Sequence, residues 1–277
     1  MTSKLAMNTG TFNFESVDLP SALQAISRGT FGGVNFRDNH IQEYLRKGHS
    51  IQEIKNLLEE YRLDAIAVDS LRNWQEWDSW DRKKKEEYRN SAVQLFHECR
   101  EIGCHCIAAP AFAEKSDLPE DTRSFKAMCD IAKPYNILLA LEFLPWAELK
   151  DIRMAWEVVR RADCSNGGLL VDSFHFFKGG SQAKDFREVP TEKIFLIHLN
   201  DAPDLPIHSK EMCFNHRVFP GEGVFPLKEF LDVLILEKKY GGWISLEVLN
   251  KENPKISYPG IVERGKRSIE RILSRYE

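Results

Sequence analysis

The sequence predicts an α/β protein, a single (β/α)8 TIM barrel with eight parallel strands that spans residues 1–277. Short apolar runs alternate eight times with amphipathic stretches, and this repetition implies a parallel sheet closed as a barrel. A chain of 277 residues with 43% hydrophobic content has the ordinary size of one such barrel. No linker, low-complexity segment or change in composition divides the chain, so one domain is expected.

Each predicted strand is a short run rich in leucine, isoleucine, valine or alanine, followed by a loop and then a helical pattern. In chain order the eight runs cover residues 5–9, 33–36, 64–68, 104–109, 137–141, 168–172, 194–199 and 243–248. The clearest helices between them cover residues 50–63, with apolar side chains at helical spacing, and residues 227–241, which end at a pair of glycines.

Four strands in the second half of the chain carry a side chain that can bind a metal: Glu142, Asp172, His198 and Glu247. A charge buried without a partner costs several kcal/mol, whereas one divalent cation shared by all four residues would satisfy the three carboxylates together. Each residue could instead have its own partner at a strand end. The same placement on four consecutive strands favours the joint site, because the ends of barrel strands carry the chemistry.

The type of ligand indicates the type of metal. Three carboxylates and one imidazole offer mostly hard oxygen ligands, which suit Mn²⁺, Mg²⁺ or Co²⁺ and also accept Zn²⁺. One divalent metal ion is therefore the expected cofactor. A zinc site built from Cys104, His105 and Cys106 lacks a second paired motif, and the six dispersed cysteines are expected to be reduced thiols.

Charge and hydropathy narrow the classes of partner. The formal net charge is −4, from 38 basic and 42 acidic residues, which gives no cationic field for a phosphate backbone. No stretch approaches the roughly 18 to 20 apolar residues of a membrane span, and the N-terminus has no secretory apolar region. We expect a cytoplasmic protein that binds neither nucleic acid nor membrane.

Several segments are similar to the xylose isomerase-like family of sugar isomerases and epimerases, and within it to the 2-keto-myo-inositol (inosose) isomerases. The most specific segments, in this order, are DSFHF from residue 172, IHLND from residue 197 and RVFPGEG from residue 217. The chain departs from the inosose isomerase pattern at Asn35, where an acidic residue is usual, at Asn200 before Asp201, and at Glu222 between two glycines. These departures lie on the substrate side and leave the metal ligands unchanged.

The resemblance implies roles for individual residues. It assigns the metal to Glu142, Asp172, His198 and Glu247, and it makes Glu142 and Glu247 the groups that remove and return a proton. His175 and Arg217 would lie beside the substrate oxygens, with His175 able to move a hydroxyl proton. Arg217 could instead face solvent and pair with Glu222. Trp146 could form an apolar wall for a sugar ring or simply pack at the rim.

The function that the resemblance implies is metal-dependent isomerisation or epimerisation of a keto-inositol or keto-sugar through an enediolate. A lyase is the nearest alternative, because related barrels dehydrate inosose or 3-dehydroshikimate or cleave 3-keto-glycosides, including C-glycosides. An apurinic endonuclease would need many more ligands on the early strands, which end here in Asn35, Arg37 and Asp69. A non-catalytic binding protein would hold the metal without turnover.

Two further features are interpreted from the sequence. Trp74, Trp77 and Trp80 lie in a polar loop, where they could form a lid or a subunit contact, so a homo-oligomer is left open. His40 flanks a predicted surface helix and is assigned no role.

Overall fold

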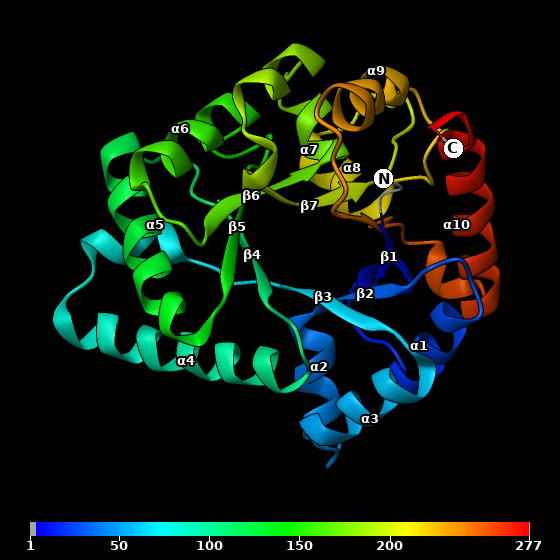
Figure 1. Cartoon of the computed structure of the whole chain (residues 1–277), viewed down its shortest axis with the longest axis horizontal. Helices are drawn as coiled ribbons and strands as arrows, with labels where there is room; N and C mark the ends of the chain where they lie inside the picture. Colours follow the sequence, from blue (N-terminus) through cyan, green and yellow to red (C-terminus); the bar gives the residue numbers. More distant parts are fainter. Residues whose placement is uncertain (1–3, 277) are drawn as a thin grey trace.

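The computed structural model describes residues 4–276 and shows a closed barrel of eight parallel strands (Figure 1). The strands pair in sequence order, and β8 closes the ring against β1. Their bounds are β1 (Lys4–Asn8), β2 (Gly33–Arg37), β3 (Asp64–Asp69), β4 (Cys106–Pro110), β5 (Leu138–Glu142), β6 (Gly167–Asp172), β7 (Ile194–Leu199) and β8 (Trp243–Leu246). The predicted TIM barrel is confirmed.

Helices surround the barrel on its outside (Figure 1). Their bounds are α1 (Leu19–Ser27), α2 (Asp38–Arg46), α3 (Ile51–Tyr61), α4 (Arg82–Glu101), α5 (Leu118–Ala132), α6 (Ile152–Ala162), α7 (Ser173–Lys178), α8 (Ser209–Asn215), α9 (Leu227–Leu231) and α10 (Tyr258–Leu273). No helix of the described residues is long and apolar enough to cross a membrane.

The two helices read from the sequence begin where expected, but one ends early. Ser50 caps α3 in a capping box with Glu53, which satisfies free N–H groups at the helix start. The helix that begins at Leu227 widens into a π-helix over Asp232–Glu237 and does not reach the glycine pair. Lys239 turns the chain with a φ of 54°, so that Tyr240 is buried before β8 begins.

Small side chains fill the barrel interior and leave its upper end to polar groups. Ala6, Ala67, Ala108 and Ala140 form a compact cluster inside the ring together with Leu170 and other buried residues. Above this cluster, the ends of the strands bury an unusual set of polar side chains, among them Asn8, Asn35, Asp69, Asp172 and His198. Active sites of TIM barrels lie at this end of the strands.

Trp74 of the tryptophan-rich segment belongs to the core and does not form a lid. Trp74 begins the 3-10 helix η2 (Trp74–Ser79), is fully buried, and packs edge-on against Phe125 with ring centroids 5.5 Å apart. Its Nε1 donates to the carbonyl oxygens of Ala109 and Pro110 at 3.2 and 3.1 Å. Because these carbonyls lie at the end of β4, the indole anchors the loop after β3 to the next strand.

Trp77 and Trp80 form a separate, partly exposed group. Both rings lie within 6.3 Å of each other and pack around Tyr88 of α4. His40 also differs from its expected surface position, because it is buried with its Nδ1 2.9 Å from the Thr9 hydroxyl. The local pattern of polar neighbours hid the burial of both Trp74 and His40.

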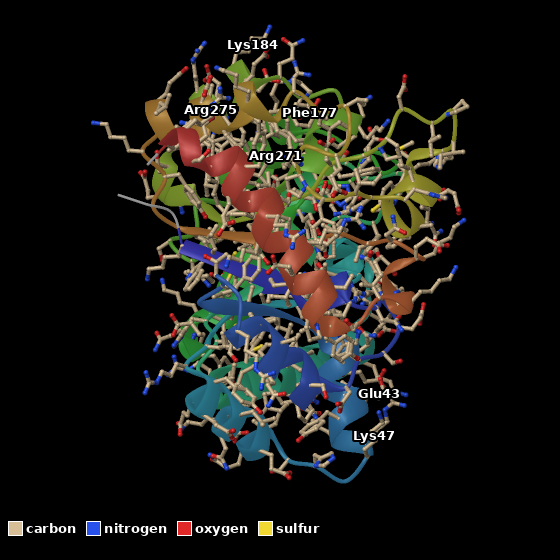
Figure 2. All side chains as sticks on the ribbon, turned by 90° about the vertical axis from the view of Figure 1, so that its right-hand side faces the viewer. Glu43, Lys47, Phe177, Lys184, Arg271 and Arg275 are labelled. Carbon is tan, nitrogen blue, oxygen red and sulfur yellow. The ribbon has the colours of Figure 1, made fainter. Side chains whose placement is uncertain are left out.

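The carboxyl-terminal helix supports one turn beside the site. α10 crosses the outside of the barrel and carries the labelled side chain of Arg271 (Figure 2). Arg271 and Ser268 both donate to the Pro220 carbonyl, at 3.1 and 2.7 Å. The PGEG turn that follows Arg217 is therefore held from the outside by α10.

Candidate active site

The four predicted ligands lie at the same end of four adjacent strands. Glu142 and Asp172 are the last residues of β5 and β6, His198 lies near the end of β7, and Glu247 follows the last residue of β8. In the sheet register, Asp172 lies opposite His198. Closure of the ring therefore brings together side chains that are up to 105 residues apart in sequence, as Glu142 and Glu247 are.

His198 lies at the centre of the three carboxylates. Its Nδ1 is 3.3 Å from Glu247 Oε2, 3.8 Å from Asp172 Oδ2 and 3.9 Å from Glu142 Oε1. This nitrogen is buried and has no hydrogen-bond partner among the described residues. Ligands that share one cation at about 2.0 to 2.2 Å are separated by distances of this order. The three carboxylates therefore lie at distances from His198 that a shared divalent ion would require.

Asn35 sets the orientation of His198. The Nε2 of His198 lies 2.6 Å from the Asn35 side-chain oxygen, which can only accept a hydrogen bond. Nε2 therefore carries a hydrogen, and Nδ1 is the nitrogen that faces the carboxylates and would bind a cation after losing its own proton. Asn35 is one of the departures from the family pattern, and its neutral amide provides an acceptor that a carboxylate would also provide.

We expect Asn35→Leu to weaken manganese binding by about 10- to 100-fold, because the imidazole loses the group that orients it. Calorimetric titration of the variant with Mn²⁺ measures the change. Asn90→Leu on the exposed face of α4 removes the same amide far from the site and should bind as the unchanged protein does. Equal affinities for Asn35→Leu and the unchanged protein would show that Asn35 does not position the ligand.

Asp172 is held by the start of a helix as well as by its neighbours. It is the N-cap of α7, and its Oδ1 accepts from the backbone N–H of Phe174 at 2.6 Å. The Asn200 amide donates to the same oxygen at 3.0 Å. Oδ2 remains directed toward the site and accepts from Arg217 at 2.6 Å. Backbone and side chain together fix this carboxylate in one orientation.

Arg217 binds two of the predicted ligands and does not pair with Glu222. Its Nη1 donates to Asp172 Oδ2 and to Glu247 Oε2, at 2.6 and 2.9 Å, and its side chain is 1% exposed. Glu222 pairs instead with Arg264 at 2.6 Å on the surface. The solvent-facing alternative for Arg217 is therefore wrong, because the chain turns inward at Arg217 and outward again at the glycines.

Asp201 shapes that turn. Its two carboxylate oxygens accept from the backbone N–H groups of Gly221, Gly223 and Phe225 at 3.0 to 3.1 Å. A Cβ on Gly223 would lie 2.3 Å from both the Ala202 carbonyl and the Asp201 carboxylate, so only glycine fits. Asp201 thus organises the loop that carries Arg217.

The surroundings of Glu142 and Glu247 shift the pKa values of these two carboxyl groups in opposite directions. Burial holds the pKa of Glu142 well above its usual value. Repulsion from Glu247, Asp172 and Asp69 adds to this shift, whereas the attraction of His198 opposes it. Burial would also raise the pKa of Glu247, but His198 and Arg217 outweigh burial and hold it well below its usual value. For His198, burial is outweighed by the same carboxylates, which raise its pKa to about 10. Two carboxyl groups with separated pKa values suit acid and base roles.

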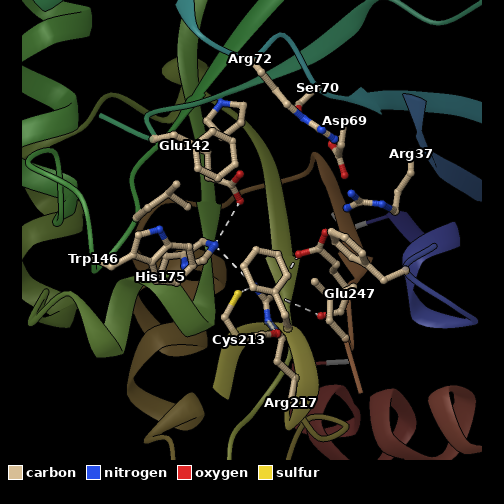
Figure 3. Close-up of a pocket in the computed structure, with 16 residues that line it drawn as sticks. Arg37, Asp69, Ser70, Arg72, Glu142, Trp146, His175, Cys213, Arg217 and Glu247 are labelled. Atoms are coloured by element: carbon tan, nitrogen blue, oxygen red, sulfur yellow. Dashed lines mark hydrogen bonds and ion pairs between the residues drawn. The ribbon is translucent and has the colours of Figure 1, made fainter. Parts of the chain in front are cut away.

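His175 and Trp146 lie together on one wall of a cavity of about 230 Å³ at the end of the barrel (Figure 3). His175 Nε2 is 3.7 Å from Glu142 Oε1, and its ring packs edge-on against Trp146 with centroids 5.4 Å apart. Burial lowers the pKa of His175 to about 4, so the imidazole is neutral at pH 7. Glu142, Glu247 and Arg217 line the same cavity.

A family model described as xylose isomerase-like TIM barrel matches residues 23–271. The chain belongs to this family. The inosose isomerase of Bacillus velezensis is 27% identical over 99% of this chain and 98% of its own length. The crystal structure of an IOLI protein with a bound zinc atom superposes with a TM-score of 0.88 and 25% identity, covering 99% of both chains.

A second group of relatives in the xylose isomerase-like family has a different activity. The 3-dehydroshikimate dehydratase of Pseudomonas aeruginosa is 30% identical over 84% of this chain, but the match covers only 36% of that protein. The similarity therefore concerns one part of a longer dehydratase. The relatives of this chain therefore include both isomerases and a dehydratase.

The structure also reveals site residues that sequence reasoning did not assign. Two triads of potential ligands lie side by side, with ligand atoms within 4.8 Å in each: Asp69, His198 and Glu247, and Glu142, Asp172 and His175. The predicted quartet takes two members from each triad. Asp69 ends β3 as Glu142 ends β5, so the same strand-end signal was present in the sequence. Asp69 therefore lies beside the predicted ligands, although the sequence analysis assigned it no role.

Proposed function

We propose that this chain is a divalent-metal-dependent isomerase or epimerase of a keto-inositol or keto-sugar. Glu142, Asp172, His198 and Glu247 would hold the ion, which could be Mn²⁺, Mg²⁺, Co²⁺ or Zn²⁺. The observation that carries the proposal is the buried, unpartnered Nδ1 of His198 within 4 Å of three carboxylates. Full-length similarity to inosose isomerases supports the substrate class.

When bound, the cation would stabilise the negative charge that develops on the oxygens of an α-hydroxy ketone as it loses a proton to form an enediolate. Glu142 and Glu247 belong to strands that are three places apart in the ring, so their carboxyl groups approach the cavity from different sides. One carboxylate can then remove the proton and the other return it to the neighbouring carbon or the opposite face.

Three other residues complete the proposed mechanism. Arg217 holds Asp172 and Glu247 in place through its two charge-assisted hydrogen bonds. His175 can carry a proton between substrate hydroxyls, because it lines the cavity and its Nε2 lies 3.7 Å from Glu142 Oε1. Trp146 provides an apolar wall against which a sugar or cyclitol ring can pack.

A lyase is the second candidate, favoured by the similarity to 3-dehydroshikimate dehydratases. Removal of the same α-proton, followed by loss of a hydroxyl on the next carbon, would release water in place of an isomer. His175, which is neutral at pH 7, would receive the abstracted proton from Glu142, 3.7 Å away, and pass it to the departing oxygen. Either reaction uses a small molecule and needs no nucleic acid or membrane partner, and we expect it to take place in the cytoplasm. The tryptophan group around Tyr88 leaves a homo-oligomer open.

The decisive experiment is deuterium uptake from D₂O, followed by NMR, with manganese-loaded protein. The substrates are inosose, ketohexoses, 3-dehydroshikimate and a 3-keto-glucoside. We expect exchange of one α-proton, and we expect Glu247→Gln to reduce the exchange rate by at least about 100-fold as a missing acid or base does. Glu252→Gln on the exposed loop should exchange normally. An isomer among the products supports the first candidate, and a dehydrated or cleaved product supports the second. Absence of exchange with every substrate would contradict both.

A further inference from the structure

Asp69 is a cavity residue with one unused carboxylate oxygen. It ends β3, is 7% exposed, and lines the cavity that holds Glu142 and Glu247. Its Oδ2 accepts from the Asn8 amide at 2.7 Å, whereas its Oδ1 is buried and has no hydrogen bond to any described residue. A buried carboxylate oxygen without a donor is costly, so a donor from a bound molecule would stabilise it.

The neighbours of Asp69 do not supply that donor. Asn35 lies beside it, but the Asn35 amide nitrogen donates to the carbonyls of Phe36 and Ala67, both at 3.3 Å. Asn8 divides its amide between Asp69 Oδ2 and Glu247 Oε1, the latter at 3.2 Å. The free oxygen of Asp69 therefore remains available to a hydroxyl group that enters the cavity.

Arg37 offers the complementary donor on the adjacent strand. It ends β2, lies opposite Asp69 in the sheet register, and is also 7% exposed. Its guanidinium lies 3.8 Å above the Phe14 ring, and its Nε donates to Asn39 at 3.2 Å. Within residues 4–276, Arg37 has no carboxylate oxygen within 4.0 Å, so its terminal nitrogens can bind an incoming oxygen.

The opposite walls of the cavity differ in chemistry. Figure 3 shows Arg37 and Asp69 on one side and Trp146 with His175 on the other. A ring packed against the indole would turn its edge toward Asp69 and Arg37. The other cation on this wall, Arg72, is already bound by Asp38 at 3.1 Å and by Ser70 at 3.2 Å.

We propose that Asp69 and Arg37 recognise two neighbouring hydroxyls of an uncharged polyhydroxylated ring. Asp69 Oδ1 would accept a hydrogen bond from one hydroxyl, and the Arg37 terminal nitrogens would donate to the oxygen of the next. A ring carboxylate could pair with Arg37, but Asp69 and Glu247 would repel it and it has no hydrogen to donate to Asp69 Oδ1. The inference rests on the proposed function, because it assumes that the reacting carbons lie at Glu142 and Glu247. It makes a cyclitol or sugar the preferred substrate class over a ring acid such as 3-dehydroshikimate.

Calorimetry with probes that do not react tests the inference. The manganese-loaded protein is titrated with myo-inositol, with its monodeoxy derivatives and with shikimate. We expect myo-inositol to bind at least about tenfold more tightly than shikimate, and Asp69→Asn to raise the Kd for myo-inositol by about 10- to 100-fold, as for a hydrogen bond to a charged group. The monodeoxy derivative that lacks the hydroxyl bound by Asp69 should bind the unchanged protein as weakly as myo-inositol binds Asp69→Asn. Its Kd should rise little further in Asp69→Asn.

Two variants control the experiment. Asp64→Asn removes the same charge from the exposed start of β3 and should leave every Kd unchanged. Arg37→Lys keeps the charge but loses the planar fork, and should weaken myo-inositol binding by about fivefold even if Asp69→Asn folds poorly.

Several outcomes would overturn the inference. The inference would be wrong if shikimate bound more tightly than myo-inositol, or if neither probe bound. It would also be wrong if all monodeoxy derivatives lost the same affinity, because this wall would then not recognise individual hydroxyls. Loss of manganese binding in Asp69→Asn would make Asp69 a metal ligand. Because these probes do not react, failure of the proposed function is seen separately: myo-inositol would then bind as expected while no ketone exchanges a proton in D₂O.

Discussion

Replacing Arg217 with methionine should lower the free energy of unfolding of the metal-free protein by about 3 to 5 kcal/mol. The guanidinium is 1% exposed and binds two buried carboxylates, Asp172 and Glu247, which would be left close together without a balancing charge. Chemical denaturation at pH 7 measures the loss. Arg264→Met breaks a surface pair with Glu222 and should cost less than about 1 kcal/mol.

The loss at Arg217 should depend on pH in a defined direction. Attraction by His198 and Arg217, which outweighs burial, depresses the pKa of Glu247 below its usual value of 4.5. A depressed carboxylate contributes stability that is present above its unfolded pKa and lost as the pH falls through its folded pKa. The difference between the unchanged protein and Arg217→Met should therefore be largest above pH 4.5 and decrease at lower pH.

Manganese should restore part of that stability, because a bound cation balances the same carboxylates. At a hundred times its Kd, an ion that binds only the folded state adds about 2.7 kcal/mol. If Arg217→Met were no less stable than Arg264→Met, or if its loss were the same at pH 3 as at pH 7, the guanidinium would not be balancing these charges.

Trp74→Ala should lower the free energy of unfolding by about 3 to 5 kcal/mol, because it leaves a cavity in the core and two carbonyls without their donor. Trp74→Phe keeps a ring but loses the N–H group, and should cost about 1 to 3 kcal/mol. Thermal or urea unfolding measures both.

Trp80→Ala serves as the matched control, because this ring is only partly buried against Tyr88 and Trp77. Its loss should be clearly smaller than that of Trp74→Ala. Similar losses of unfolding free energy at the two positions would contradict the assignment of Trp74 to the core. The whole loop would then be interpreted again as a lid or a subunit contact.

The local pattern of the sequence was sufficient for the barrel and for four of its rim residues. Buried parallel strands read as apolar runs, and a charged side chain at the end of such a run is conspicuous because its burial needs a partner. Glu142, Asp172 and Glu247 are found in this way, and His198 follows from its place near the end of β7. The TIM barrel then implies that these ends meet.

Only the tertiary structure decided which groups surround those residues. Asp69 comes within 4.8 Å of His198 and Glu247 because the sheet closes into a ring, and no spacing in the sequence encodes that distance. The burial of Trp74 and Arg217 follows from contacts with segments tens of residues away, and the residues on either side of Trp74 are polar. Periodicity reports which side of an element faces the core, but loops have no period, so their side chains are placed by packing alone.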